Sequence, residues 1–152
     1  MDCEPGAYLY FGVNREVTRE EFAQRIADNT VLEVLNKVDV HPGDVFFIQS
    51  GTIHAIGAGI LICEIQQNSN CTYRVYDYDR RGADGKPREL HVEKALEVSR
   101  FTPSPRQETT AGEETVPGGK KRPLAACNYF ATQRLTVDTA MELEVGEDSF
   151  AS

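Results

Sequence analysis

Apolar and polar positions near the start of the chain alternate in a way that predicts one strand followed by two short helices. Residues 7–13, AYLYFGV, are rich in aromatic and β-branched side chains and predict a strand. Thr18 and Glu21 have the spacing of a capping box, in which each side chain satisfies the other residue's backbone donor. The apolar periodicity behind them predicts an amphipathic helix near 19–28, and a second short helix is expected over 30–38.

The pattern changes after the second helix to short apolar runs separated by turn residues. Strands are expected near 44–48, 60–66 and 72–77, where apolar runs end at Gly, Asn, Ser or Pro-Gly. A helix is expected near 91–99, where apolar residues fall largely on one side. Short strands at this spacing are typical of a β-barrel or β-sandwich.

The same pattern divides the chain into three parts. Residues 1–101 carry the first group of elements, and 102–122 form a Pro-, Gly-, Thr- and charge-rich segment expected to be a linker or mobile loop. Residues 123–152 contain further strand patterns, which look like the start of a second β unit. Strand patterns close to both ends need partners to cover their edges, so we expect a piece of a longer protein.

Composition narrows the class to a globular protein of ordinary domain size. The 152 residues are 40% hydrophobic and 26% charged, and the net charge of −8 argues against nonspecific nucleic-acid binding. The four cysteines form no CxxC pair, and Cys63, inside an apolar run, is expected to be a buried thiol. Without a signal peptide or about 18 consecutive apolar residues, the expected compartment is the cytoplasm, with no membrane contact.

His54 is the first candidate for chemistry. On its own, a histidine at a strand end is more often structural or exposed than a metal ligand. Gly43, Gly51 and His54 nevertheless follow the order G-x7-G-x2-H, which resembles the second metal-site motif of the cupin superfamily. Gln49 stands where that motif usually has proline, which affects the stiffness of the turn rather than the metal chemistry.

A longer resemblance covers about residues 1–100. The segments PGDVFFIQSGTIHAIGAG, EIQQNSNCTYRVYDYDR and GKPRELHVEKAL look very like the type I mannose-6-phosphate isomerases in their short bacterial form. The resemblance implies a mainly β cupin fold, a jelly roll or double-stranded β-helix with short helical insertions. Residues 1–101 would be the second half of the catalytic cupin domain, and 123–152 the incomplete start of a C-terminal cupin.

The family carries one zinc ion per full-length chain, held by a Gln-x-His pair, a glutamate and a later histidine. His54 matches that later histidine, while the segment that carries the other ligands is missing from this sequence. His41 and His91 do not stand at family ligand positions, and both are expected to be structural or exposed. One histidine cannot hold a catalytic zinc ion, which needs about three protein ligands.

Three further residues are expected near the site. Arg74 matches a family arginine that projects into the pocket, although without that match it would be taken for a solvent-facing side chain. Glu64 is predicted to take part in proton transfer or to orient Arg74, with a purely structural pairing to Arg74 as the alternative. Arg80 is a candidate for binding the substrate phosphate, or else a surface charge beside Arg81.

Two functions remain open at this point. The first is a fragment of a zinc-dependent isomerase that interconverts mannose 6-phosphate and fructose 6-phosphate, inactive by itself because ligands are absent. The alternative is a metal-free, cupin-like binding or regulatory module. For the fragment, the expected partners are a small phosphosugar and either the preceding part of the enzyme or a second copy, paired through open sheet edges.

Overall fold

The chain divides into two compact units, Met1–Arg106 and Gln107–Ser152. A computed structural model describes residues 1–69, 71–78, 80–105 and 112–144. These residues form three sheets and two α-helices, so the expected mainly β fold class is confirmed. Within the same ranges, no helix has the length and apolarity needed to cross a membrane.

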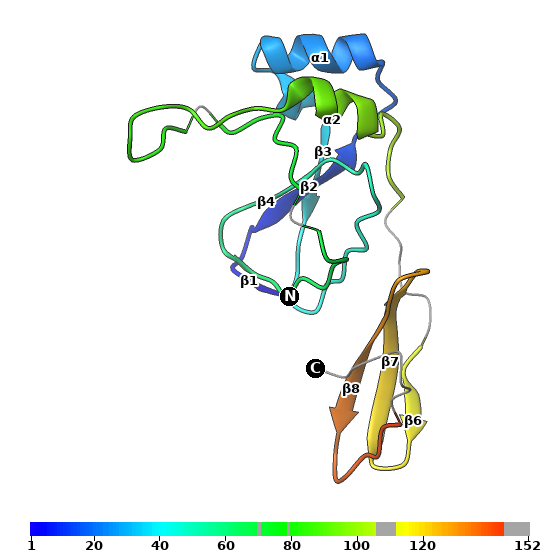
Figure 1. The fold of residues 1–152 in the computed structure, drawn as a ribbon. Coiled ribbons are helices and arrows are strands. Elements are labelled where there is room, and N and C mark those ends of the chain that lie inside the picture. The colour runs from blue at the N-terminus through cyan, green and yellow to red at the C-terminus, as the bar shows by residue number, and fades with distance from the viewer. Residues whose placement is uncertain (70, 79, 106–111, 145–152) are drawn as a thin grey trace. The chain divides into compact units, whose positions relative to one another are not determined.

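A three-stranded antiparallel sheet forms the centre of the first unit, with strand order β3-β2-β4 (Figure 1). The strands are β2 (Tyr8–Val13), β3 (Leu35–Asp39) and β4 (His54–Ile56). β2 is the strand expected over 7–13. It lies in the middle because its aromatic and apolar side chains are buried on both faces of the sheet.

A bulge at Gly12 moves the side chains of β2 from one face of the sheet to the other. Between the pairs Tyr10–Lys37 and Val13–Leu35, β2 advances three residues while β3 advances two. Gly12 has a φ of +69°, a left-handed conformation that glycine adopts without steric cost. The extra residue brings Val13 to the face opposite the one it would otherwise occupy.

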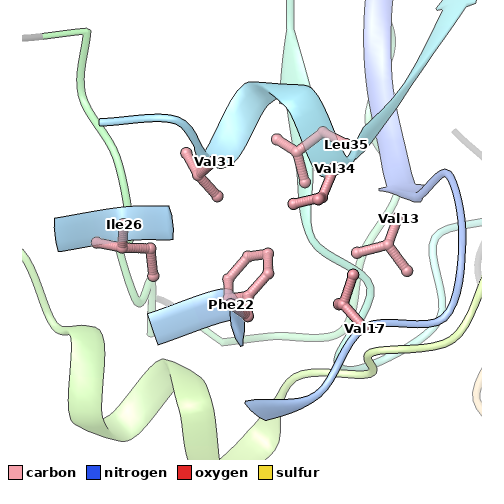
Figure 2. Close-up of a cluster of buried hydrophobic side chains, with 7 residues drawn as sticks. All are labelled: Val13, Val17, Phe22, Ile26, Val31, Val34 and Leu35. Atoms are coloured by element: carbon pink, nitrogen blue, oxygen red, sulfur yellow. The ribbon is translucent and has the colours of Figure 1, made fainter. Parts of the chain in front are cut away.

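The larger of two buried clusters packs beneath helix α1 (Arg19–Ala27) and 3-10 helix η1 (Val31–Val34). Figure 2 shows its members, here called the Phe22 cluster: Val13, Val17, Phe22, Ile26, Val31, Val34 and Leu35. Helix α2 (Val92–Val98) lies beside α1 in Figure 1 and packs on this cluster through Val92 and Leu96. The helix expected near 91–99 is therefore confirmed, and it closes one face of the sheet.

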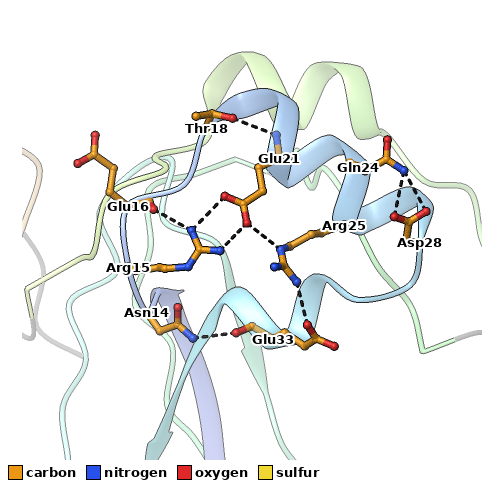
Figure 3. Close-up of polar contacts among 9 residues, drawn as sticks. All are labelled: Asn14, Arg15, Glu16, Thr18, Glu21, Gln24, Arg25, Asp28 and Glu33. Carbon is orange, nitrogen blue, oxygen red and sulfur yellow. Dashed lines mark hydrogen bonds and ion pairs between the residues drawn. The ribbon is translucent and has the colours of Figure 1, made fainter.

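Polar contacts fix the start of α1 (Figure 3). The Thr18 hydroxyl accepts a hydrogen bond from the Glu21 amide at 3.0 Å, which confirms Thr18 as the cap, while the Glu21 side chain contacts arginines instead of completing the predicted reciprocal box. The Glu21 carboxylate also pairs with Arg15 and, at 3.0 Å, with Arg25, and Arg25 continues at 2.9 Å to Glu33. Hydrogen bonds from Arg15 and then Arg25 lower the pKa of Glu21 from 4.5 to about 2.

The second buried cluster lies on the opposite face of the central sheet and is called the Phe11 cluster: Ala7, Leu9, Phe11 and Val40. Phe46 packs against it, with its ring 5.7 Å from that of Phe11. A short second sheet pairs β1 (Asp2–Cys3) with β5 (Ile60–Leu61). Ile60 also packs against the Phe11 cluster.

Several predicted elements are wrong. Residues 44–48 and 72–77 form no strand, and of 60–66 only Ile60–Leu61 does. A run of apolar residues becomes a β-strand only where a neighbour pairs with its backbone groups, and the described residues offer these segments no such neighbour. The prediction that Cys63 is buried is also wrong: it is exposed, and its segment joins none of the sheets formed by the described residues.

The helix expected over 30–38 is also wrong. Only Val31–Val34 is helical, as a short 3-10 turn, and Leu35–Asp39 is strand β3. The β-branched valines of this segment favour extended backbone, and pairing with β2 decides the outcome.

The second unit contains one antiparallel sheet of order β6-β7-β8. Its strands are β6 (Glu114–Val116), β7 (Gly119–Ala126) and β8 (Ala131–Val137). The loop expected over 102–122 therefore overlaps β6 and the beginning of β7. Gly118, with a φ of +85°, makes the tight turn between these two strands. From composition alone, this glycine indicates a loop and does not reveal the strands on either side.

Candidate functional site

The carboxylate of Asp77 lies at the centre of a group of arginines in the first unit. Asp77 is only 7% exposed, which is unusual for a charged side chain unless it is paired. Arg88 donates from Nε to Oδ2 at 2.7 Å and from Nη2 to Oδ1. Arg80 donates from Nη2 to Oδ1 at 2.9 Å, and Nε of Arg74 lies 4.0 Å from the same oxygen. We call Arg74, Asp77, Arg80 and Arg88 the arginine cluster.

Electrostatics keep the cluster charged. Hydrogen bonds from Arg88, and then from Arg80, lower the pKa of Asp77 from 3.8 to about 2, although desolvation by burial opposes this shift. Three guanidinium groups surround one carboxylate, so the cluster carries a local excess of two positive charges (three minus one). This excess stands against a net charge of −8 for the whole chain and favours binding of an anion.

The segment just before α2 holds Arg74 in place. The Arg74 amide donates to Nδ1 of His91 at 3.3 Å, and the His91 amide donates to the Arg74 carbonyl at 2.7 Å. Nη1 of Arg74 donates to the Glu89 carbonyl at 3.3 Å. Because α2 is packed on the Phe22 cluster, residues 88–91 connect the arginine cluster to the core.

His54 begins β4 and is exposed. It lies opposite Phe11 of β2, and cross-strand partners point to the same face of a sheet. Nδ1 of His54 lies 3.0 Å from the Thr52 carbonyl. Since a carbonyl only accepts, Nδ1 carries the hydrogen in this contact, and in the neutral ring Nε2 keeps a lone pair that could bind a metal.

The residues next to His54 and Arg74 pack on the same buried cluster. Ile53, next to His54, packs against the Phe22 cluster, as do Val75 and Tyr76 next to Arg74. Because side chains alternate along a strand, His54 faces away from that cluster. Because 72–77 is not a strand, Arg74 does not reach its position from a strand, and its expected place near His54 stays a prediction.

The structure brings two of the predicted site residues, Arg74 and Arg80, together. Both arginines reach the carboxylate of Asp77. Glu64 is exposed, and neither a hydrogen bond nor an ion pair joins it to another described residue. The alternative role of Glu64, a structural ion pair with Arg74, is therefore absent from the described part of the chain, and its role in proton transfer stays a prediction.

The described residues do not form a zinc site. No group of three or more His, Cys, Asp or Glu side chains within 1–69, 71–78, 80–105 and 112–144 is arranged to hold a metal ion. His41 is on an exposed turn, with Nδ1 3.8 Å from Asp44, and His91 contacts Arg74. These two histidines are thus structural or exposed, as expected, and His54 remains the one candidate ligand from the sequence.

Two residues of the cluster, Asp77 and Arg88, were not recognised as site candidates from the sequence. Both lie inside segments that carry the family resemblance, Asp77 in VYDYDR and Arg88 in GKPREL. A signal was present in Asp77, an acidic residue within an aromatic run. No local pattern indicates that Arg88 reaches back to it.

Comparison with known proteins gives several matches to one group of enzymes. The chain is 41% identical over 144 residues to mannose-6-phosphate isomerase ManA of Bacillus subtilis, a match that covers 95% of this chain and 45% of the relative. It is 49% identical over 98 residues to the probable mannose-6-phosphate isomerase GmuF of the same organism, covering 64% of this chain and 31% of that one. No protein-family model matches the chain.

A solved structure gives the same result. The crystal structure of mannose 6-phosphate isomerase from Bacillus subtilis superposes with a TM-score of 0.81 at 32% identity, covering 90% of this chain and 43% of the other. The fold is therefore a mainly β cupin fold, as the resemblance predicted. The chain is homologous to the bacterial mannose-6-phosphate isomerases. It spans less than half the length of these relatives.

Proposed function

We propose that this chain is part of a zinc-dependent mannose-6-phosphate isomerase, which interconverts mannose 6-phosphate and fructose 6-phosphate through an enediol. The observation that carries the proposal is the match to ManA over 95% of the chain. The arginine cluster supports the proposal, because its excess positive charge complements the negative charge of the substrate phosphate and of the intermediate.

One zinc ion is the proposed cofactor, with His54 as one ligand. The hydrogen bond from Nδ1 to the Thr52 carbonyl supports this role, because metal-binding histidines commonly donate their other ring hydrogen to a backbone carbonyl. The described residues provide no further ligand group, so the remaining ligands would come from outside them. His54 is exposed, which agrees with a ligand whose partner ligands lie outside the described residues.

The arginines and Glu64 would serve the reaction itself. Isomerisation moves a proton between C1 and C2 of the sugar, and negative charge develops on the adjoining oxygens. Arg74 would stabilise that charge with a fixed guanidinium, and Glu64 would transfer the proton or help to orient the site. Arg80 would bind the phosphate, because it is 63% exposed and its guanidinium has more N–H donors than its contacts with Asp77 use.

The proposal extends to location and partners. The four cysteines Cys3, Cys63, Cys71 and Cys127 are free, which supports a cytoplasmic location, where thiols stay reduced. β3 and β4 are the outer strands of the central sheet, so each has an edge on which another strand could pair. We propose that this pairing partner is either another part of the isomerase or a second copy of the chain.

A direct test uses the isolated 152-residue chain. It should show no turnover of mannose 6-phosphate and only weak zinc binding, because His54 is its one proposed ligand and a catalytic zinc ion needs about three. Purification with zinc, metal analysis and a coupled isomerase assay measure both properties. Turnover together with stoichiometric zinc would prove the proposed ligand arrangement wrong.

The second candidate function is a metal-free, cupin-like binding module. The lack of a metal-binding group among the described residues favours it. A chimera separates the two functions: the chain replaces the matching stretch of 144 residues in ManA of Bacillus subtilis. If the chimera binds zinc and loses it on His54→Ala substitution, the isomerase is supported. A folded chimera that binds no zinc supports the metal-free module.

A further inference from the structure

The carboxylate of the arginine cluster accepts hydrogen bonds from two guanidinium groups, those of Arg88 and Arg80, and forms a longer ion pair with the third, that of Arg74. Arg88 approaches Asp77 with two nitrogens, one to each carboxylate oxygen. This two-point contact fixes the plane of the carboxylate. Arg80 and Arg74 then share Oδ1, at 2.9 Å and 4.0 Å.

Arg80 is held by more than its side-chain contact. Its Nε lies 3.4 Å from the Asp77 carbonyl, and its amide donates to the same carbonyl at 3.0 Å. Together with the hydrogen bond from Nη2 to the Asp77 carboxylate at 2.9 Å, these contacts fix one arrangement of a long side chain that is otherwise 63% exposed. An arginine fixed before a ligand arrives loses less rotamer freedom when it binds.

Arg88 belongs to the segment that also clamps Arg74. Glu89 and His91 contact Arg74 through the Glu89 carbonyl, the His91 ring and the His91 amide. The cluster is thus built from two segments of the chain, 74–80 and 88–91, and the ion pair between Asp77 and Arg88 joins them.

We propose that Asp77 and Arg88 are positioning residues: the carboxylate of Asp77, oriented by Arg88, holds the guanidinium groups of Arg74 and Arg80 together to receive an anionic sugar phosphate. The proposal rests on the proposed function for its ligand, and on the contacts of the cluster for its geometry. Neither Asp77 nor Arg88 needs to touch the substrate. Their role is to order the two arginines that do.

The test follows the side-chain Nε–H and Nη–H groups of a ¹⁵N-arginine-labelled 152-residue chain by NMR. In the wild type, the Nε–H of Arg88 should exchange with water roughly tenfold more slowly than that of Arg81, because a hydrogen bond between charged groups is worth at least a decade in an equilibrium constant. Arg81 is the internal control, since its described contact is to the Gly85 carbonyl through Nη1 and not through Nε. Equal exchange at Arg88 and Arg81 would overturn the proposal without any variant.

Two variants then test the link itself. Asp77→Asn keeps the shape but removes the charge. It should raise exchange at Nε of Arg88 to the level of Arg81 and speed exchange at the Nη2 hydrogens of Arg80, the nitrogen that donates to the carboxylate. Arg88→Lys keeps the charge but not the two-point contact, and it should loosen Arg80 while the chain stays folded. Asp39→Asn, at an exposed position in β3, is the matched control and should change none of these signals. Unchanged Arg80 exchange in a folded Asp77→Asn or Arg88→Lys chain would contradict the proposal.

Titration with inorganic phosphate separates this inference from the proposed function. In the wild type, phosphate should shift the Arg80 signal, and Arg88→Lys should weaken the affinity by about tenfold, the effect of one lost charge-assisted contact. If phosphate leaves the wild-type Arg80 signal unchanged while exchange is slow, the phosphate role fails and the ordering of the arginines stands. If phosphate binds equally well to the wild type and to Arg88→Lys, the positioning role fails and the phosphate role stands.

Discussion

Arg88 reaches the carboxylate of Asp77 across eleven residues of sequence and contacts both of its oxygens. The intervening chain is a polar loop in which Arg81 and Pro87 form an isolated antiparallel bridge. After this loop the chain runs back beside the segment that begins at Arg74 and ends at Arg80, the two predicted site residues. A site that looks local in the sequence is therefore completed by a residue from the next segment.

Removal of the Phe22 ring should destabilise the first unit strongly. Phe22 is fully buried and its ring lies 5.3 Å from that of Phe101. Phe22→Ala should lower the free energy of unfolding by about 3–5 kcal/mol, the range for loss of a buried aromatic ring. Urea denaturation followed by circular dichroism measures this. Val98→Ala, at a side chain 55% exposed, is the control and should change stability by roughly 0.5 kcal/mol or less.

The ion pairs of Glu21 should make stability depend on acid pH. Its pKa is lowered in the folded chain from 4.5 to about 2, so the carboxylate stabilises the fold above the unfolded value, and this contribution is lost as pH falls from about 4.5 to 2. Glu21→Gln should therefore be less stable than the wild type near neutral pH, with the difference shrinking towards pH 2. Denaturation at several pH values measures it. A difference that is constant with pH would show that the ion pairs are not its cause.

Gly12 should resist substitution for two separable reasons. Its φ of +69° is costly for any residue with a Cβ, and an added Cβ would meet the Ser104 hydroxyl oxygen at 2.9 Å. Gly43 has a φ of +87° but open space around it. Gly43→Ala should cost roughly 1–2 kcal/mol from backbone strain alone, and Gly12→Ala should cost more. Equal costs in thermal or urea unfolding would show that Ser104 moves aside freely.

The sequence was most informative where the signal is local. The cap between Thr18 and Glu21 predicted α1, and it is present as a direct hydrogen bond. The strand expected over 7–13 became β2 for an equally local reason, its aromatic and β-branched content. Elements that depend on a partner were not predictable in this way. Leu35–Asp39 became a strand because β2 pairs with it, while 72–77 has no pairing partner among the described residues.

The candidate site shows the same division. Arg74 was found through a family resemblance and Arg80 through its position at the expected strand end, and a shared carboxylate brings them together. Arg88 was missed because nothing near it in the sequence reports a contact with Asp77. His54 and Glu64 remain predictions, since the described residues around them supply neither a metal-binding group nor a charged partner.

His54 and Arg74 should fail in different ways in the chimera with ManA. His54→Ala should remove zinc, because a catalytic site has few protein ligands. Arg74→Ala should leave zinc bound and slow turnover on the order of 10²-fold or more, the usual loss for one charge-stabilising donor. Metal analysis and steady-state kinetics on the two variants separate these roles. Near-full turnover in Arg74→Ala would show that Arg74 has no part in the reaction.

Isomerase activity of the unaltered chimera tests the central claim most directly. The chain would replace the stretch of ManA to which it is 41% identical over 144 residues, so that ManA supplies everything outside that stretch. The purified chimera and ManA itself are assayed side by side for conversion of mannose 6-phosphate to fructose 6-phosphate, with the isolated chain as a further sample. Turnover by the chimera, lost on addition of a zinc chelator and absent from the isolated chain, is the predicted result. A folded, zinc-bound chimera with no turnover would contradict the claim that this chain forms part of an isomerase.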